Sequence, residues 1–263
     1  MLEEARALAV PTMPGEDEPP PSAVVFANAC GIVPDAWQAD VLTSQGRKRI
    51  LNCCRQSGKS TVTAIAALHE AAYVPGSLVL LLSPSQRQSG ELHRKVTELY
   101  KACTLPLPSI AAESALRFEL DNGSRVIALP GSEATTRGYS AATLAIVDEA
   151  ARVPDVLIAA IRPTLAVTDG RLIALSTPSG RRGWFFTNWS TGEGWERTRV
   201  TAADCSRIST AFLEDERREL GEFAYAAEYL CEFQDVQTSV FASELIQRAL
   251  ANDIKPLWWS ETP

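Results

Sequence analysis

The segment that most constrains the fold spans residues 49–73, where a short apolar run, a tight polar loop and an alanine-rich stretch follow one another. Residues 49–53 have the length and composition of a buried strand, and the apolar spacing of residues 61–73 is typical of a helix. The loop between them reads Cys53-Cys54-Arg55-Gln56-Ser57-Gly58-Lys59-Ser60 and matches the pattern Gly-x-x-x-x-Gly-Lys-Ser/Thr at every fixed position but the first. Strand, loop and helix in this order predict a phosphate-binding loop.

Each residue type in this loop has a chemical reason. Backbone N–H groups and the helix N-terminus face the phosphates, Gly58 lets the backbone approach closely, and Lys59 adds a point charge between the β- and γ-phosphates. Ser60 is expected to place its hydroxyl on Mg²⁺. The expected nucleotide contacts are Arg55, Gln56, Ser57, Gly58, Lys59, Ser60 and Thr61. Cys53 in place of the first glycine makes the loop a variant, and an accidental Gly-Lys-Ser in a strand–helix turn is the alternative.

A second polar site follows the apolar run 144–147, which ends in two adjacent carboxylates, Asp148 and Glu149. A buried carboxylate needs a partner, and a metal ion is a suitable one, so Asp148 is expected to hold Mg²⁺ through water. In an extended backbone Glu149 points the other way, toward the γ-phosphate, where a carboxylate can activate the attacking water. We therefore predict that Glu149 is the catalytic base. The alternative is that the pair only caps the helix expected near Pro154.

Short apolar runs alternate with helical stretches along most of the chain, which favours an α/β fold with a mainly parallel central sheet flanked by helices. The candidate strands are residues 49–53, 78–82, 144–147 and 172–175, with residues 195–200 as a last strand. Residues 116–120 and 125–129 flank Asn122-Gly123, the strongest short hairpin signal, so an inserted β-hairpin is expected there. Residues 211–233 indicate one or two helices.

Composition limits the class of protein. Hydrophobic residues at 46% and charged residues at 22% lie near globular averages, and no apolar run reaches the roughly 18 residues of a membrane span, so a soluble protein with no membrane partner is expected. The net charge of −7 disfavours a charge-driven nucleic-acid coat, so any contact with DNA must be weak and local. The 6 cysteines contain no CxxC pair and are expected to be reduced thiols. Together with the absence of a secretory signal, they predict a cytoplasmic location.

The chain divides into three parts by composition. Residues 1–22, rich in Glu and Pro, are expected to be a disordered tail. Residues 23–235 carry every motif and are expected to be one domain, and residues 236–263 resemble a linker.

Three motifs together resemble the ATPase motor of the large terminase subunit of tailed bacteriophages, which packages double-stranded DNA into procapsids. They are Arg55-Gln56-Ser57-Gly58-Lys59-Ser60, Val147-Asp148-Glu149-Ala150 and Leu175-Ser176-Thr177-Pro178, and the similarity covers residues 33–233. The resemblance implies a P-loop NTPase fold of the additional-strand (ASCE) type, with ATP and Mg²⁺ as cofactors. It also implies a homo-oligomeric ring, by resemblance a pentamer, with double-stranded DNA, portal protein, small terminase subunit and procapsid as partners. Such a motor works in the cytoplasm of the bacterial host, at the procapsid, and is not part of the mature virion.

The resemblance also gives roles to single residues. Gln38 is similar to the family's adenine-reading glutamine, and a carboxamide can read an adenine edge. Ser176 and Thr177 resemble the coupling motif that senses the γ-phosphate. Arg137, on a loop beside Gly138, looks like an arginine finger inserted into a neighbouring subunit, with Arg55 as the rival phosphate contact. The alternatives are a surface glutamine, a Thr-Pro that only ends a strand, and a solvated loop arginine.

Two rival functions stay open. A helicase-like DNA-dependent ATPase shares the phosphate loop and the Asp-Glu strand end, but the stretch after Asn188 is too short for a second motor lobe. A nucleotide-gated DNA-binding or assembly module with feeble hydrolysis is the non-enzymatic reading. The acidic residues after Phe233 are few and scattered, so the nuclease domain usual in this family is expected to be absent and no nuclease activity is expected.

Overall fold

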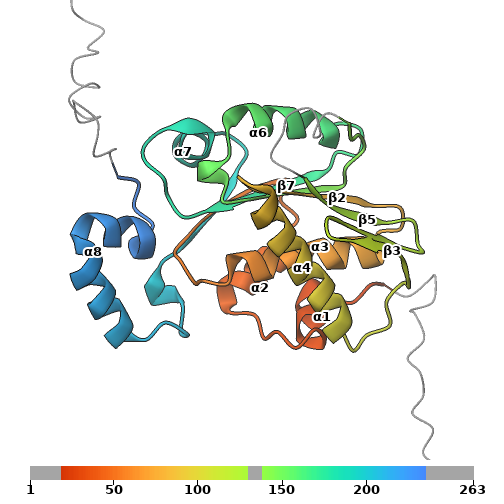
Figure 1. The fold of residues 1–263 in the computed structure, drawn as a ribbon, viewed down its shortest axis with the longest axis horizontal. Helices are drawn as coiled ribbons and strands as arrows, with labels where there is room; N and C mark the ends of the chain where they lie inside the picture. The colour runs from red at the N-terminus through yellow and green to blue at the C-terminus, as the bar shows by residue number, and fades with distance from the viewer. Residues whose placement is uncertain (1–18, 130–137, 235–263) are drawn as a thin grey trace, which may run out of the picture.

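An 8-stranded sheet forms the centre of the molecule, in the order β3-β4-β5-β2-β6-β7-β1-β8 (Figure 1). The computed structural model describes residues 19–129 and 138–234. The strands are β1 (Lys48–Cys53), β2 (Leu78–Leu82), β3 (Ile110–Ser114), β4 (Arg117–Leu120), β5 (Arg125–Leu129), β6 (Leu144–Asp148), β7 (Arg171–Ser176) and β8 (Glu196–Val200).

Most of the sheet is parallel. β2 pairs with β5 and β6, β6 with β7, and β1 with β7 and β8, all in parallel register. β3 and β4 are antiparallel additions at one edge. The expected hairpin is formed by β4 and β5, with Gly123 at a left-handed φ of 82° in its turn. β5 pairs in parallel along the whole of β2 and four of its five residues are buried, so this hairpin extends the main sheet instead of standing apart from it.

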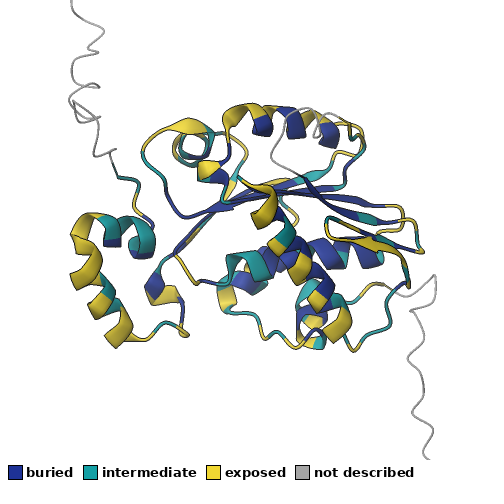
Figure 2. Ribbon diagram, in the orientation of Figure 1, coloured by how far each residue is buried: buried dark blue, intermediate teal, exposed yellow. Residues whose placement is uncertain are grey.

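Alternate side chains of the central strands enter two separate cores, one on each face of the sheet. In β1, Leu51 and Cys53 belong to one core and Ile50 to the other; in β6, Ile146 and Val147 divide in the same way. Residues of α1, α2, α3 and α4 complete the first core, and residues of α6 and α7 complete the second. The central strands, such as β2 and β6, are therefore buried on both faces (Figure 2), which explains why their sequences are continuous apolar runs.

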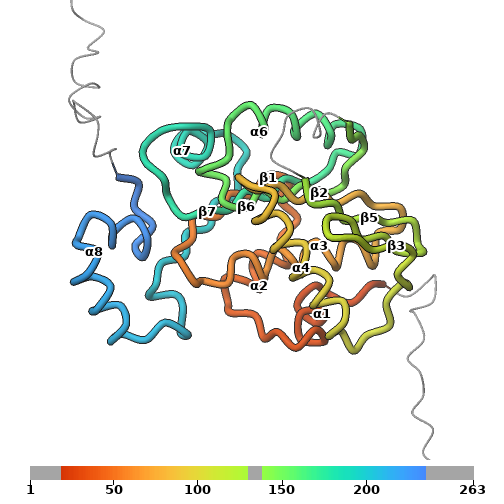
Figure 3. The backbone as a smooth tube through the Cα atoms, viewed as in Figure 1, coloured from red at the N-terminus to blue at the C-terminus, as the bar shows by residue number. Residues whose placement is uncertain are grey.

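Helices and short 3-10 turns connect the strands of this sheet. They are α1 (Ala23–Ala29), α2 (Ala36–Thr43), α3 (Lys59–Tyr73), α4 (Gln86–Ala102), α6 (Asp155–Ile161), α7 (Gly183–Ser190) and α8 (Thr210–Leu230), with short 3-10 turns η1 (Ala150–Arg152), η2 (Arg162–Leu165) and η3 (Ala202–Asp204). α8 lies at the side of the molecule away from β3 (Figure 3), and Gly221, with φ 73° and ψ 163°, divides it into two helical pieces. This division matches the expectation of one or two helices over residues 211–233.

The predicted strands are all present, with ends that differ by one residue or so, and the α/β fold with a mainly parallel sheet is confirmed. β3 has no counterpart among the predicted strands, because four of its five residues are exposed and its sequence lacks an apolar alternation. Among the described residues, none of the helices is both long enough and apolar enough to cross a membrane.

Candidate nucleotide-binding site

The carboxyl ends of β1, β6 and β7 meet at one edge of the sheet, and a polar loop follows each of them. β7 lies between β1 and β6, so one additional strand separates the strand before the phosphate loop from the strand that ends in Asp148. Parallel pairing aligns Asn52 of β1 with Ser176 of β7, and Leu175 of β7 with Asp148 of β6. Three segments that are distant in the sequence therefore deliver their polar residues to one place, as is usual for ligand sites in open α/β sheets.

The loop after β1 has the backbone shape that an anion site requires. Gln56 and Gly58 adopt left-handed φ values of 59° and 87°, and α3 begins at Lys59, directly after Gly58. Turns of this kind group successive N–H groups into a concavity, and the start of α3 adds its own free N–H groups. The Ser57 hydroxyl donates to the Cys54 carbonyl at 3.0 Å and closes the loop. Thr61 follows in the first turn of α3.

Cys53, which replaces the first glycine of the motif, lies in β1 and not in the loop. It pairs in register with Val200 of β8, and its side chain is completely buried in the core. A strand backbone does not need glycine, so this departure leaves the loop geometry intact. Burial raises the pKa of the Cys53 thiol. It is one of six free cysteines among the described residues.

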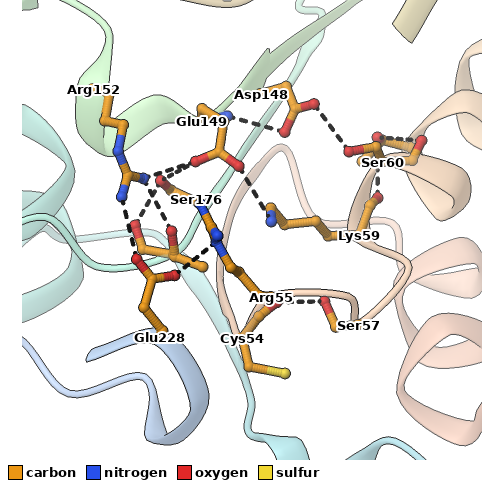
Figure 4. A network of polar contacts seen from close by, with 12 residues as sticks. Cys54, Arg55, Ser57, Lys59, Ser60, Asp148, Glu149, Arg152, Ser176 and Glu228 are labelled. Carbon is orange, nitrogen blue, oxygen red and sulfur yellow. Dashed lines mark hydrogen bonds and ion pairs between the residues drawn. The ribbon is translucent and has the colours of Figure 1, made fainter. Parts of the chain in front are cut away.

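Lys59 and Ser60 each contact a carboxylate from the end of β6 (Figure 4). Lys59 Nζ lies 3.2 Å from Glu149 Oε1, and its side chain is 11% exposed. The Ser60 hydroxyl donates to Asp148 Oδ2 at 3.0 Å. Burial is the main cause that raises the pKa of Asp148, with the charge of Glu149 adding to it and Lys59 and Ser60 opposing it.

The backbone of Glu149 differs from the sequence-based expectation. Glu149 has φ 51° and ψ 41°, a left-handed conformation at the start of η1, and is not extended. The expectation of an extended residue is therefore wrong, because β6 ends at Asp148 and the chain turns immediately. The turn nevertheless brings the carboxylate to Lys59.

Ser176 and Thr177 lie beside the same carboxylate. The Ser176 hydroxyl donates to the Thr177 carbonyl at 2.7 Å and lies 3.4 Å from Glu149 Oε2. Arg152 Nη1 donates to Glu149 Oε2 at 2.9 Å and to Thr177 Oγ1 at 3.0 Å. Arg152 thus joins the acidic strand end to the loop after β7, and both oxygens of Glu149 have a cationic partner.

Sequence reasoning missed Arg152 and also missed Glu228 of α8. Glu228 Oε2 lies 3.1 Å from Arg55 Nε, and its other oxygen lies 3.9 Å from Arg152 Nη2. The backbone N–H of Arg55 also donates to the backbone carbonyl of Glu228 at 3.0 Å. α8 is therefore hydrogen-bonded to the phosphate loop. Arg152 stands one helical turn after Glu149, a spacing that could have indicated it; Glu228 is one of many acidic residues in its helix and carries no such signal.

Gln38 lies against the phosphate loop from the other side. Its carboxamide oxygen accepts the Asp35 N–H at 2.9 Å and caps α2, and its side chain is buried. Its nitrogen stands 2.8 Å from the point where a Cβ on Gly58 would lie. Arg207, a further residue that sequence reasoning missed, donates to the Ser57 carbonyl at 2.9 Å and pairs with Asp35 at 2.8 Å. Arg137, the expected arginine finger, lies outside the described residues.

The arrangement suits the binding of a phosphate chain together with a hard cation. The Ser60 hydroxyl and the Asp148 carboxylate are oxygen ligands of the kind that Mg²⁺ prefers. Across residues 19–129 and 138–234, no group of three or more His, Cys, Asp or Glu could hold a metal ion. Mg²⁺ in this place would therefore need nucleotide oxygens and water as its other ligands, which is its usual mode in nucleotide sites.

Known proteins match the chain over most of its length. The family described as terminase large subunit, T4likevirus-type, N-terminal, matches residues 50–248. The large terminase subunit of Thermus phage G20c is 30% identical over 253 residues, a match that covers 82% of this chain and 52% of that protein. The chain therefore spans about half the length of the curated relatives that it matches.

Solved structures share the fold. The large terminase ATPase domain of Thermus phage P74-26 superposes with a TM-score of 0.68 at 23% identity, covering 80% of this chain and 98% of that domain. The large terminase of a thermophilic bacteriophage, solved in complex with ADP, superposes with a TM-score of 0.64 at 15% identity, covering 76% of this chain and 53% of that protein.

Proposed function

Because this chain belongs to the terminase large subunit family, we propose that it hydrolyses ATP and that the hydrolysis drives double-stranded phage DNA into a procapsid. The single observation that carries the proposal is the pairing of Lys59 with Glu149 beside the pairing of Ser60 with Asp148, at the mouth of a preformed phosphate loop. The thermophilic-phage terminase solved in complex with ADP has the same fold, which supports a nucleotide as the ligand.

Each residue of the site has a separate role in the proposed reaction. Lys59 exchanges Glu149 for the β- and γ-phosphates when nucleotide binds, which releases Glu149 Oε1. That oxygen then accepts a hydrogen bond from the attacking water and takes its proton, while Arg152 and Ser176 hold Oε2 in place. Ser60 and Asp148 are the residues that would hold Mg²⁺, whose charge would offset that of the phosphates.

We further propose that a neighbouring subunit completes the site through Arg137. An arginine supplied in trans is worth about 10³ to 10⁵ in rate, and Arg55, the rival, is bound to Glu228 in this structure. Such a site requires a homo-oligomeric ring, a pentamer by family resemblance. Arg137→Ala subunits mixed with Glu149→Gln subunits should regain part of the lost turnover, since each variant supplies what the other lacks; no recovery on mixing would contradict the role in trans.

The proposed partners are those of a packaging motor: double-stranded DNA, portal protein, small terminase subunit and procapsid. The work takes place in the cytoplasm of the bacterial host, at the procapsid, and the protein leaves before the virion matures. The net charge of −7 means that DNA binding should be weak and salt-sensitive.

An ATPase assay with and without double-stranded DNA separates this function from its rivals. A motor should release phosphate only with Mg²⁺, faster with DNA, and Lys59→Ala should lose nucleotide binding. A helicase-like ATPase should respond to single-stranded DNA instead. An assembly module should bind ATP with negligible turnover. The missing first glycine of the motif would permit such a module, but Cys53 lies in β1, where no glycine is needed.

We also propose that this chain by itself does not cleave DNA. Two-metal cleavage needs several carboxylates that converge on ions about 4 Å apart, and within the described residues no cluster of that kind occurs. Supercoiled plasmid should stay intact with Mg²⁺ or Mn²⁺. Nicking that copurifies with the protein and survives Lys59→Ala would contradict the proposal.

A further inference from the structure

A pocket of about 520 Å³ lies where β1 and β7 begin, at the edge of the sheet opposite the phosphate loop. The last turn of α6 and the turn η2 form its other wall. Leu165 and Leu172 give the pocket an apolar floor, because both belong to the core that α6 and α7 complete. Its volume suits a small molecule or a few residues of a peptide, and it shares no residue with the proposed nucleotide site.

Three cationic residues, Arg47, Lys48 and Arg162, line the pocket around this floor, and all three are exposed. Arg47 pairs with Asp169, which also lines the pocket. In the part of the chain that the structure describes, neither Lys48 nor Arg162 has an ion-pair partner. The pocket therefore has an excess of positive charge, although the chain as a whole carries −7. Positive charge beside an apolar floor is complementary to an acidic peptide segment.

The described part of the chain begins close to this pocket. The His69 Nε2–H, near the end of α3, donates to the Pro21 carbonyl at 2.8 Å. The next residue of α3, Glu70, pairs with Arg171 at 2.6 Å. Arg171 directly follows Gly170, which lines the pocket. A short run of contacts thus connects Pro21 to the pocket along the same edge of the sheet.

The sequence before Pro21 matches the pocket in charge and in length. Glu16, Asp17 and Glu18 lie just outside the described residues and lead into Pro19-Pro20-Pro21. Proline-rich segments are extended and advance about 3.1 Å per residue, so the three carboxylates lie about 9 to 16 Å along the chain from Pro21. Such a spacer is stiff, which lowers the entropy that the acidic residues lose when they bind.

We propose that Glu16, Asp17 and Glu18 dock in this pocket of their own chain, with their carboxylates on Lys48 and Arg162. A tethered segment meets its site at an effective concentration in the millimolar range, so the tail is favoured over a separate acidic protein. The pairs are exposed to solvent, so salt weakens the contact. The acidic segment is then bound across the amino-terminal edge of the sheet and is not the free tail that its composition predicts.

Cross-linking of the full chain with a carbodiimide tests the proposal, because this reagent joins a lysine amine to a carboxylate that touches it. Mass spectrometry of the digested protein should find Lys48 joined to residues 16–18 at low ionic strength, and the yield should fall at high salt. Lys95 is the matched control, because it is exposed on α4, which packs on the other face of the sheet. It should form no such link.

Charge reversal adds a second readout. Arg162→Glu should lower the yield at Lys48 by about 5- to 30-fold, because one attraction between exposed charges becomes one repulsion. Combining it with Asp17→Arg should restore the link through Glu16 and Glu18. Lys95→Glu makes the same change in net charge on α4 and should leave the yield at Lys48 unaltered.

Three results would overturn the proposal. The first is wild-type protein without a link between Lys48 and residues 16–18, or with an equal link at Lys95. The second is an Arg162→Glu variant that gives the wild-type yield. The third is a mixture of ¹⁴N- and ¹⁵N-labelled protein in which the links join only different chains, which would make a second copy the occupant.

Discussion

Replacing Glu149 with Gln should separate ATP binding from ATP hydrolysis. The substitution keeps the shape of the side chain and removes the charge that could accept a proton from water. Loss of a general base costs about 10²- to 10⁴-fold in rate, or about 2.7 to 5.4 kcal/mol in the activation barrier. ATP affinity should stay equal or rise, because Lys59 no longer has an ionised partner 3.2 Å away that competes with the phosphates.

The cost in stability should be smaller than the cost in rate. The Lys59 side chain is 11% exposed, so its charge-assisted bond is worth about 1 to 3 kcal/mol, whereas Arg152, 38% exposed, loses about 0.2 to 1 kcal/mol. Removal of the charge also relieves Asp148, whose pKa is raised by burial first and by Glu149 second. We therefore expect the free energy of unfolding to fall by about 1 to 3 kcal/mol.

Glu70→Gln provides a matched control for this experiment. Glu70 is a 10% exposed carboxylate that pairs with Arg171 at 2.6 Å, and it lies on α3 about 16 Å beyond Lys59, at about 1.5 Å per residue. It should lose similar stability and keep full turnover. Single-turnover phosphate release and equilibrium ATP binding give the readouts. Turnover by Glu149→Gln within tenfold of the wild type, or an equal loss in Glu70→Gln, would refute the assignment of the base.

Three further predictions follow from individual contacts. Gly58→Ala should lower ATP affinity more than tenfold and cost about 1 to 2 kcal/mol of stability. The reason is that φ of Gly58 is +87° and that the added Cβ would stand 2.8 Å from the buried Gln38 amide and 3.2 Å from Arg207. An unchanged ATP affinity in titrations would contradict this. Arg152→Ala should lower kcat by about 10- to 100-fold and change the KM for ATP little, since it removes the group that orients Glu149, the proposed base; a change confined to KM would show a role in binding instead. His93 is buried, and burial lowers its pKa, with Glu113 opposing, so its stabilising contribution is complete above the unfolded pKa near 6.5 and is lost as pH falls below it. His93→Gln should therefore reduce the fall in melting temperature between pH 7.5 and pH 5.5, and an unchanged slope would contradict the assignment.

The sequence by itself determined the local secondary structure and the polar residues at its ends. Short-range backbone preferences and burial determine three local structures from neighbouring residues alone. These are the strand–loop–helix around Lys59, the apolar strand that ends in Asp148, and the Asn-Gly hairpin. The pairing of Ser60 with Asp148 was predictable too, because parallel strands deliver their loops to the same edge.

Only the tertiary structure decided how these pieces meet. Strand order places β7 between β1 and β6, and the chain makes a left-handed turn at Glu149. Segments packed from distant parts of the chain provide the contacts of Arg152, Arg207 and Glu228. The spacing of Arg152 from Glu149 could have indicated its contact, but no pattern of local spacing distinguishes Arg207 and Glu228 from the many charged residues that face solvent. A side chain acquires its role from the neighbours that the fold places within about 3 Å of it, and those neighbours lie far away in the sequence.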